Sequence, residues 1–151
     1  MVDVPVDVTF ANNAVLGGHV SVGNNSFLGG NAAVHQFARV GEGAMVGGLS
    51  GISTDLIPFG FGKGQIASLA GLNVVGLRRR GTTRAELHRL RRAYRTLFLS
   101  AGMFADRLNA VAAEFADEPM VQKIVAFIRA GGKRPLMHTK RAAEDHAGDA
   151  S

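Results

Sequence analysis

An apolar residue recurs at every sixth position through the first third of the chain. The positions are Val4, Phe10, Leu16, Val22, Leu28, Val34, Val40, Val46 and Ile52. From Leu16 onward, glycine directly follows most of these apolar residues. The residue four places after each apolar residue is mostly small. A period this regular marks a repeat architecture, so it constrains the fold more than any other feature of the sequence.

A six-residue repeat fits a parallel β-helix, in which three short strands make each triangular coil and stacked coils bury a column of aliphatic side chains. Glycine is expected where the chain turns, because it adopts unusual φ values at little steric cost. At three repeats per coil, the pattern predicts about three coils over residues 1–58. The alternative is a glycine-rich β-sandwich, which requires period-2 alternation and irregular strand spacing.

The sixfold count breaks in the segment PFGFGKG, which is typical of a loop. A short helix is predicted within ASLAGLNVVGLRRRG, ending near Gly81. Thr83 and Glu86 then form a capping-box pattern that starts a longer helix. On that helix apolar residues recur at helical spacing, and the arginines that cover the remaining surface are Arg84, Arg89, Arg91, Arg92 and Arg95.

Two more helices are predicted over residues 105–116 and 119–130. We therefore expect a helical domain over 59–132 and a polar, flexible tail over 133–151.

Composition excludes several classes of protein. The 151 residues are 46% hydrophobic and include no cysteine, which allows a core and excludes disulfides and thiolate metal sites. No apolar run is long enough to span a membrane, and no signal peptide is recognisable, so a cytoplasmic protein is expected. The net charge of +5 suggests an acidic partner.

Several kinds of site are excluded by spacing. The glycine-rich segments GEGAMVGG and GFGKG match neither a dinucleotide fingerprint nor a phosphate loop. The five histidines form no HExxH motif, so we expect no metal and no cofactor. Nucleic-acid binding through the arginine-rich helix is disfavoured because no aromatic stacking surface accompanies the charges.

His19 and His35 are the most informative polar residues of the repeat region. They are sixteen residues apart, close to the eighteen of one coil, so they should lie near each other on adjacent coils. Imidazoles placed there can contact a ligand. They can equally well donate hydrogen bonds to carbonyls of the neighbouring coil, and the sequence leaves both interpretations open.

Three segments, FANNAVLGGHVSV, NAAVHQFARVGEGAMVGGLSGISTDLIP and GLNVVGLRRRG, resemble the carboxy-terminal portion of bacterial UDP-N-acetylglucosamine O-acyltransferases. The resemblance implies a left-handed β-helix followed by a helical domain, in a homotrimer with clefts between neighbouring chains. It implies transfer of a 3-hydroxyacyl chain from acyl carrier protein to the 3-hydroxyl of UDP-N-acetylglucosamine, the first step of lipid A synthesis. The acidic carrier protein would suit the arginine-rich helix.

The same resemblance implies roles for individual residues. The backbone amide of Gly18 corresponds to the donor that faces the thioester oxygen. His19 beside it is implied to be catalytic and to line the sugar-nucleotide cleft. The residues implied to bind the sugar nucleotide are His35, Gln36, Asn73, Arg79 and Arg80. Gly48 corresponds to the position that limits acyl-chain length, and a glycine there leaves room for a long chain.

The sequence departs from the family pattern at two places. Val75 stands where a glutamate that contacts the nucleotide is common. The second departure concerns the general base and leaves two interpretations open. Counted without gaps, the family's general-base histidine falls immediately before Met1, and the first ten residues offer Asp3 and Asp7 but no histidine. A histidine base is worth roughly 10²–10⁴ in rate. The chain is therefore expected to be either a transferase that needs a base from another chain or a catalytically silent module that binds the same partners.

Overall fold

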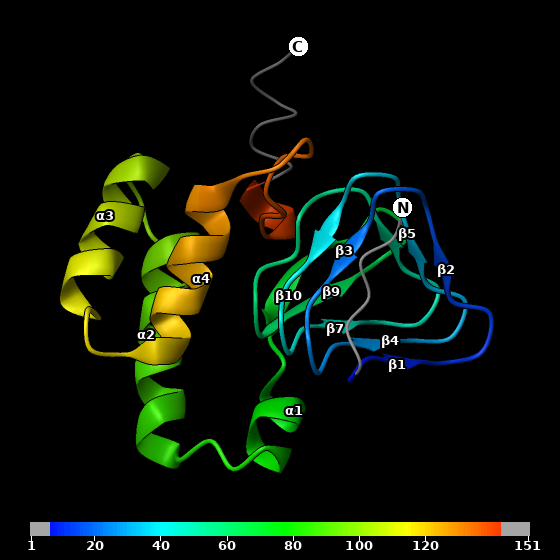
Figure 1. The fold of residues 1–151 in the computed structure, drawn as a ribbon. Helices are drawn as coiled ribbons and strands as arrows, with labels where there is room; N and C mark the ends of the chain where they lie inside the picture. Colours follow the sequence, from blue (N-terminus) through cyan, green and yellow to red (C-terminus); the bar gives the residue numbers. More distant parts are fainter. Residues whose placement is uncertain (1–6, 143–151) are drawn as a thin grey trace.

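The computed structural model describes residues 7–142, in which a β-helix packs beside a group of helices (Figure 1). Eight two-residue strands form the coils: β1 (Thr9–Phe10), β2 (Val15–Leu16), β3 (Ser21–Val22), β4 (Phe27–Leu28), β5 (Ala33–Val34), β6 (Arg39–Val40), β7 (Met45–Val46) and β8 (Gly51–Ile52). Each of the first five strands pairs in parallel with the strand eighteen residues later, as in Thr9 with Phe27. The predicted three-sided coil is confirmed.

The aliphatic residues of the repeat form the interior of the coils. Leu28, Val46 and Ile52 are fully buried, and Val22, Val34 and Val40 are almost so. At the first coil the burial weakens, since Phe10 is 41% exposed. Val4 lies outside the described residues. The small residues of the repeat are also buried, because they pack where the chain bends toward the next face.

Glycine has a different role in the coils from the one predicted. The positive φ values at the bends belong mostly to other residues, among them Asn13, Asn25 and Leu49. Four of the five glycines that follow the aliphatic residues are instead required by close approach between coils. A Cβ on Gly17, for example, would lie 2.6 Å from the backbone nitrogen of Gln36 on the next coil.

The β-helix extends beyond the predicted boundary at residue 58. Strand β9 (Gly60–Lys63) pairs in parallel with β7, and β10 (Ser68–Leu72) pairs with β9 in the antiparallel direction. The prediction that the helical domain begins at residue 59 is therefore wrong for 59–72. The glycines that suggested a loop allow tight packing instead, since a Cβ on Gly60 would lie 2.9 Å from the Cγ1 of Ile57.

Four helices follow: α1 (Val74–Arg79), α2 (Arg84–Phe98), α3 (Phe104–Glu114) and α4 (Pro119–Ala130). Figure 1 shows α2, α3 and α4 packed together on one side of the β-helix, with α1 below as the link. The capping box at the start of α2 is confirmed, because Thr83 and Glu86 exchange side-chain-to-backbone hydrogen bonds. Those hydrogen bonds from Thr83 lower the pKa of Glu86, whereas burial raises the pKa of Tyr94 on the packed face.

The segment after α4 is not a flexible tail as far as residue 142. It returns to the β-helix, where Leu136 forms a β-bridge with Asp55 and Thr139 forms one with Leu69. Met137 is only 1% exposed. Leu136 and Met137, two apolar residues among polar neighbours, anchor the segment. The prediction of a flexible tail is therefore wrong for residues 133–142. Residues 143–151 lie outside the described part.

An ion pair beneath this segment joins the two parts of the molecule. Asp55 is 1% exposed, and its carboxylate accepts hydrogen bonds from the backbone N–H and the Nε of Arg39, at 2.9 and 2.8 Å. The same guanidinium donates to the carbonyl of Phe127 in α4 and lies 3.9 Å from the centre of the Phe127 ring.

Within residues 7–142 no helix combines the length and hydropathy of a membrane span.

Candidate functional site

The triangular coils give the β-helix three edges, which we call corners. The first corner joins the face of β1 to that of β2 and contains Asn12, Asn13, Gly30, Asn31, Gly48 and Leu49. The second contains Gly18, His19, Gln36 and Phe37, and the third contains Asn24, Asn25, Glu42, Gly43, Pro58 and Phe59. Backbone hydrogen bonds connect successive coils at each corner, such as Phe37 N–H to the Gly18 carbonyl at 3.1 Å. Residues predicted to act together can therefore be assigned to particular edges.

The second corner holds four of the predicted site residues. His19, Gln36 and Gly18 lie on it, and His35 immediately precedes it on the later coil; all four are exposed. His19 has a positive φ of 57° and stacks on the ring of Phe37, with 5.0 Å between ring centroids. Eighteen residues separate this stacked pair, so the partner of His19 across the coils is Phe37 and not His35.

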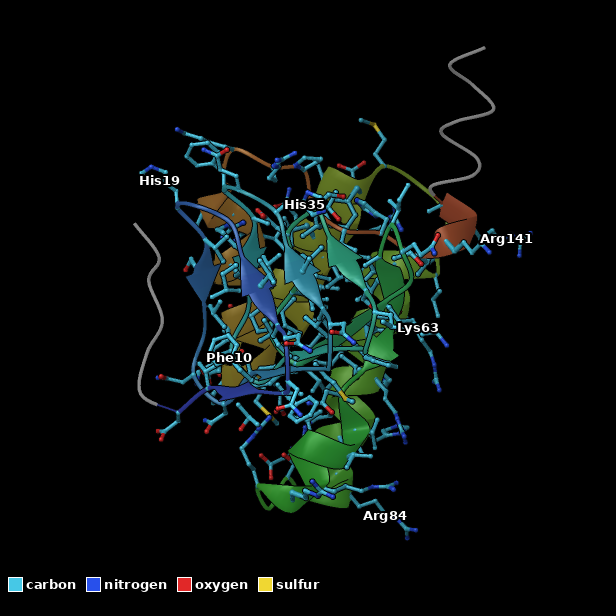
Figure 2. The ribbon with its side chains drawn as sticks, turned by 90° about the vertical axis from the view of Figure 1, so that its right-hand side faces the viewer. Phe10, His19, His35, Lys63, Arg84 and Arg141 are labelled. Carbon is cyan, nitrogen blue, oxygen red and sulfur yellow. The ribbon has the colours of Figure 1, made fainter. Side chains whose placement is uncertain are left out.

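The two imidazoles share an edge on successive coils, as their spacing predicts. Figure 2 shows His19 and His35 at the same end of the molecule, with His19 projecting outward from the ribbon. The Nε2 of His35 faces the strand β8 instead, since a Cβ on Gly51 would lie 3.6 Å from it. The imidazoles are thus neighbours along one corner and not a facing pair.

Residues after α4 also reach the second corner, which the sequence did not indicate. The Nε of Arg134 donates to the carbonyl of Gln36 at 2.9 Å, and the Nζ of Lys133 lies 4.0 Å from the ring centre of Phe37. The His19 ring, the Phe37 ring and the Lys133 ammonium are therefore held together. Two further positive charges stand beside the predicted histidines and would favour an anionic ligand there.

A hollow of about 700 Å³ opens beside the third corner and contains the other predicted binding residues. Its lining residues are Asp7, Val8, Thr9, Asn25, Ser26, Phe27, Met45, Asn73, Val75, Gly76, Arg79 and Arg80. The Nη1 of Arg80 donates to the carbonyl of Asn25 at 3.2 Å, which fixes that guanidinium against the coil. Two guanidiniums against one carboxylate leave the third-corner hollow with a net positive charge.

Asn73 orients α1 on the β-helix. Its Oδ1 accepts a hydrogen bond from the N–H of Gly76 and caps the helix, while its Nδ2 donates to the carbonyl of Gly43 at 3.0 Å. Only 7% of the residue is exposed. Both polar atoms retain one further hydrogen-bonding position, so a positioning role and a ligand contact are compatible.

Gly48 and Val75 lie at different edges of the β-helix. Gly48 is exposed at the first corner, where an added Cβ would lie 3.3 Å from the carbonyl oxygen of Gly30. It is therefore one face away from Gly18. Val75 lines the third-corner hollow and is 60% exposed, so the missing glutamate would have faced the same space as Arg79.

The predicted residues are consequently divided among three edges of one chain. Gly18, His19, His35 and Gln36 belong to the second corner, Asn73, Arg79 and Arg80 to the third, and Gly48 to the first. In Figure 2 the two histidines lie at the opposite end of the view from Arg84, which directly follows the α1 region in the chain. The structure does not bring the imidazoles next to the guanidinium pair within a single chain.

Another hollow, of about 850 Å³, lies between the β9–β10 turn and the segment after α4. Ile66, Ala67, Leu136 and Met137 give it a largely apolar lining, with Lys63 and Lys140 among its polar residues. The sequence did not indicate it, because the segments that form it are about seventy residues apart in the chain.

Comparison with known proteins connects these features to one family. The family profile described as "Udp N-acetylglucosamine O-acyltransferase; Domain 2" matches residues 55–137. An acyl-[acyl-carrier-protein]–UDP-N-acetylglucosamine O-acyltransferase of Rhizobium etli is 46% identical over 134 residues, covering 89% of this chain and 49% of the relative. One of Azorhizobium caulinodans is 53% identical over 90 residues, covering 60% and 33%.

Solved structures agree with this assignment. The UDP-N-acetylglucosamine acyltransferase of Arabidopsis superposes with a TM-score of 0.80 at 36% identity, over 87% of this chain and 48% of the other. The enzyme of Moraxella catarrhalis gives 0.83 at 34% identity, over 87% and 51%. These neighbours confirm the left-handed β-helix followed by helices. The chain spans about half the length of these relatives, and it belongs to the UDP-N-acetylglucosamine O-acyltransferase family.

Proposed function

We propose that this chain provides part of a site that transfers a 3-hydroxyacyl group from acyl carrier protein to the 3-hydroxyl of UDP-N-acetylglucosamine, the first step of lipid A synthesis. The observation that carries the proposal is the third-corner hollow, where Arg79 and Arg80 project from α1 beside Asn73. Guanidinium groups bind phosphate oxygens through paired, charge-assisted hydrogen bonds. The hollow thus offers a diphosphate two guanidiniums, and that of Arg80 is held against the coil by its hydrogen bond to Asn25.

The second corner supplies the groups for the acyl transfer itself. Within residues 7–142 the backbone N–H of Gly18 donates to no other group, so it can stabilise a developing oxyanion. The equivalent N–H at other bends is also unpaired, so what distinguishes Gly18 is the presence of His19, His35 and Gln36 around it. The side chains of His35 and Gln36 would then contact the sugar nucleotide.

We further propose that the complete site forms between copies of the chain, as a trimer. The two halves of the site lie on different edges of one β-helix, so they can meet only if the second corner of one copy faces the third corner of another. Large apolar side chains on the outer surface of the coils suit such contacts, since Val15 is 61% and Leu49 71% exposed. In that arrangement Gly48 would border the path of the acyl chain.

The acidic carrier protein would contact a narrower part of α2 than the sequence suggested. Arg89 and Arg92 form ion pairs with Glu118 and Glu114, so their charge is already compensated. Arg84, Arg91 and Arg95 have no acidic partner within residues 7–142. These three arginines would steer the carrier protein and accelerate its association.

Replacing Arg79 with alanine should weaken binding of UDP-N-acetylglucosamine about 10- to 100-fold, the range for a lost charge-assisted hydrogen bond. The side chain of Arg79 is exposed and has no hydrogen bond or ion pair within residues 7–142, so the stability of the protein should not change. Titration calorimetry with the sugar nucleotide measures the affinity. Arg92→Ala is the control, because Arg92 lies outside the hollow. Equal affinities of both variants would refute the proposed nucleotide site.

A further inference from the structure

A third hollow, separate from the two described above, lies between the end of α1 and the first turns of α2. Its volume is about 530 Å³, and its lining residues are Arg78, Thr82, Arg84, Leu87, His88 and Arg91. We call it the basic hollow. None of its residues lines the third-corner hollow, although the two are adjacent through α1. Arg78 lines the basic hollow, whereas Arg79 and Arg80 line the third-corner hollow.

The basic hollow concentrates positive charge. Three of its six lining residues are arginines, a fourth is histidine, and no carboxylate lines it. Arg84, His88 and Arg91 are spaced four and three residues apart, so they project from one face of α2, and Arg78 closes the other side. Leu87 is 4% exposed and provides an apolar base.

The absence of acidic partners distinguishes this cluster from the other arginines of α2. Arg89 and Arg92 are each paired with a glutamate, whereas the side chains of Arg78, Arg84 and Arg91 have no ion pair or hydrogen bond to any residue in the described part of the chain. A set of unpaired guanidiniums around one concavity is therefore better suited to an external anion than to packing.

We propose that the basic hollow binds a phosphate group. Guanidinium planes match the oxygens of a phosphate bidentately, and the imidazole of His88 adds a further donor when it is protonated. Two sources of that group have the same chemistry: free inorganic phosphate, or the phosphodiester that links an acyl carrier protein to its prosthetic arm. The second source rests on the proposed function, but binding of phosphate itself does not.

The test is a titration of the 151-residue chain with inorganic phosphate, followed through the NMR signals of the His88 imidazole. Saturable shifts at millimolar phosphate are expected. The double variant Arg84→Gln/Arg91→Gln should weaken phosphate binding at least 10-fold, because it removes two of the three guanidiniums of the basic hollow. The matched variant Arg89→Gln/Arg92→Gln removes two arginines from the same helix and should leave phosphate binding unchanged.

Two outcomes would overturn the proposal: no saturable shift at His88, or equal weakening by both double variants, which would indicate a general charge effect. Phosphate binding that is lost in Arg79→Ala but kept in Arg84→Gln/Arg91→Gln would also overturn it, by assigning the ion to the third-corner hollow. The source is distinguished by comparing carrier protein with and without its prosthetic arm. If the form with the arm binds more tightly and this advantage is lost only in Arg84→Gln/Arg91→Gln, the source is the phosphodiester. Equal binding of both forms excludes the phosphodiester, and the phosphate titration then assigns the basic hollow to free phosphate.

Discussion

Replacing Gly41 with alanine should destabilise the protein by about 3 kcal/mol or more, because the new methyl group has no space. An added Cβ would lie 2.6 Å from the Cα of Pro58 and 2.7 Å from the carbonyl carbon of Ile57. These are backbone atoms of the next coil and cannot move aside as a flexible side chain could. Since domains are stable by only about 5–15 kcal/mol, denaturant unfolding should show a large loss or a failure to fold.

Gly30→Ala is the matched control for this substitution. Gly30 also lies on the β-helix, but the nearest atom to its added Cβ is the carbonyl oxygen of Asn12 at 3.7 Å, an ordinary contact. Its free energy of unfolding should change by less than about 1 kcal/mol. Equal effects of the two substitutions would contradict the role of Gly41 in the close approach of successive coils.

Replacing Asp55 with alanine should cost about 3–5 kcal/mol, the range for removing one member of a buried ion pair. The carboxylate binds both the backbone N–H and the side chain of Arg39, and the guanidinium reaches the carbonyl of Phe127. Loss of Asp55 would leave that guanidinium, 19% exposed, without a counter-charge. The free energy of unfolding from urea titration is the measurement.

Two further variants separate the burial of charge from the loss of contacts. Arg39→Met/Asp55→Leu removes both charges and should recover much of the lost stability, because apolar replacements for a buried pair are often neutral. Arg92→Gln breaks a pair whose two side chains are each 49% exposed, so it should cost less than about 1 kcal/mol. A cost for Asp55→Ala as small as that for Arg92→Gln would contradict the proposed role of Asp55.

The β-helix could be predicted from the sequence because its physical cause is local and repeated. Each six-residue repeat adds one aliphatic residue to the interior and three repeats make a coil, so the period specifies both the strands and their eighteen-residue register. The reason for the glycines could not be inferred in the same way. Whether a Cβ would strike the next coil depends on the spacing between coils, which no single repeat shows.

The parts that were missed depend on contacts between distant segments. The strand β9 pairs with β7 of the preceding coil, and the segment around Met137 forms bridges to Asp55 and Leu69, which are far away in the chain. The composition of these segments resembles that of a loop or a tail. The pairing of Arg89 with Glu118 depends similarly on how α2 and α4 pack. The residues of the candidate site were identified through resemblance to a family, but their division among three corners required the structure.

That division leads to the most direct test of the proposed site. One variant, His35→Ala/Gln36→Ala, lacks second-corner contacts, and another, Arg79→Ala/Arg80→Ala, lacks third-corner contacts. Neither should bind labelled UDP-N-acetylglucosamine alone. If the site forms between copies, unfolding equal amounts of the two variants together and refolding the mixture should restore about one quarter of the wild-type sites. The reason is that each site needs one chain with an intact second corner and one with an intact third corner, and each of these is about half of the mixture. If the mixture restores no binding while the wild type binds, both corners must act within one chain, and the account is wrong.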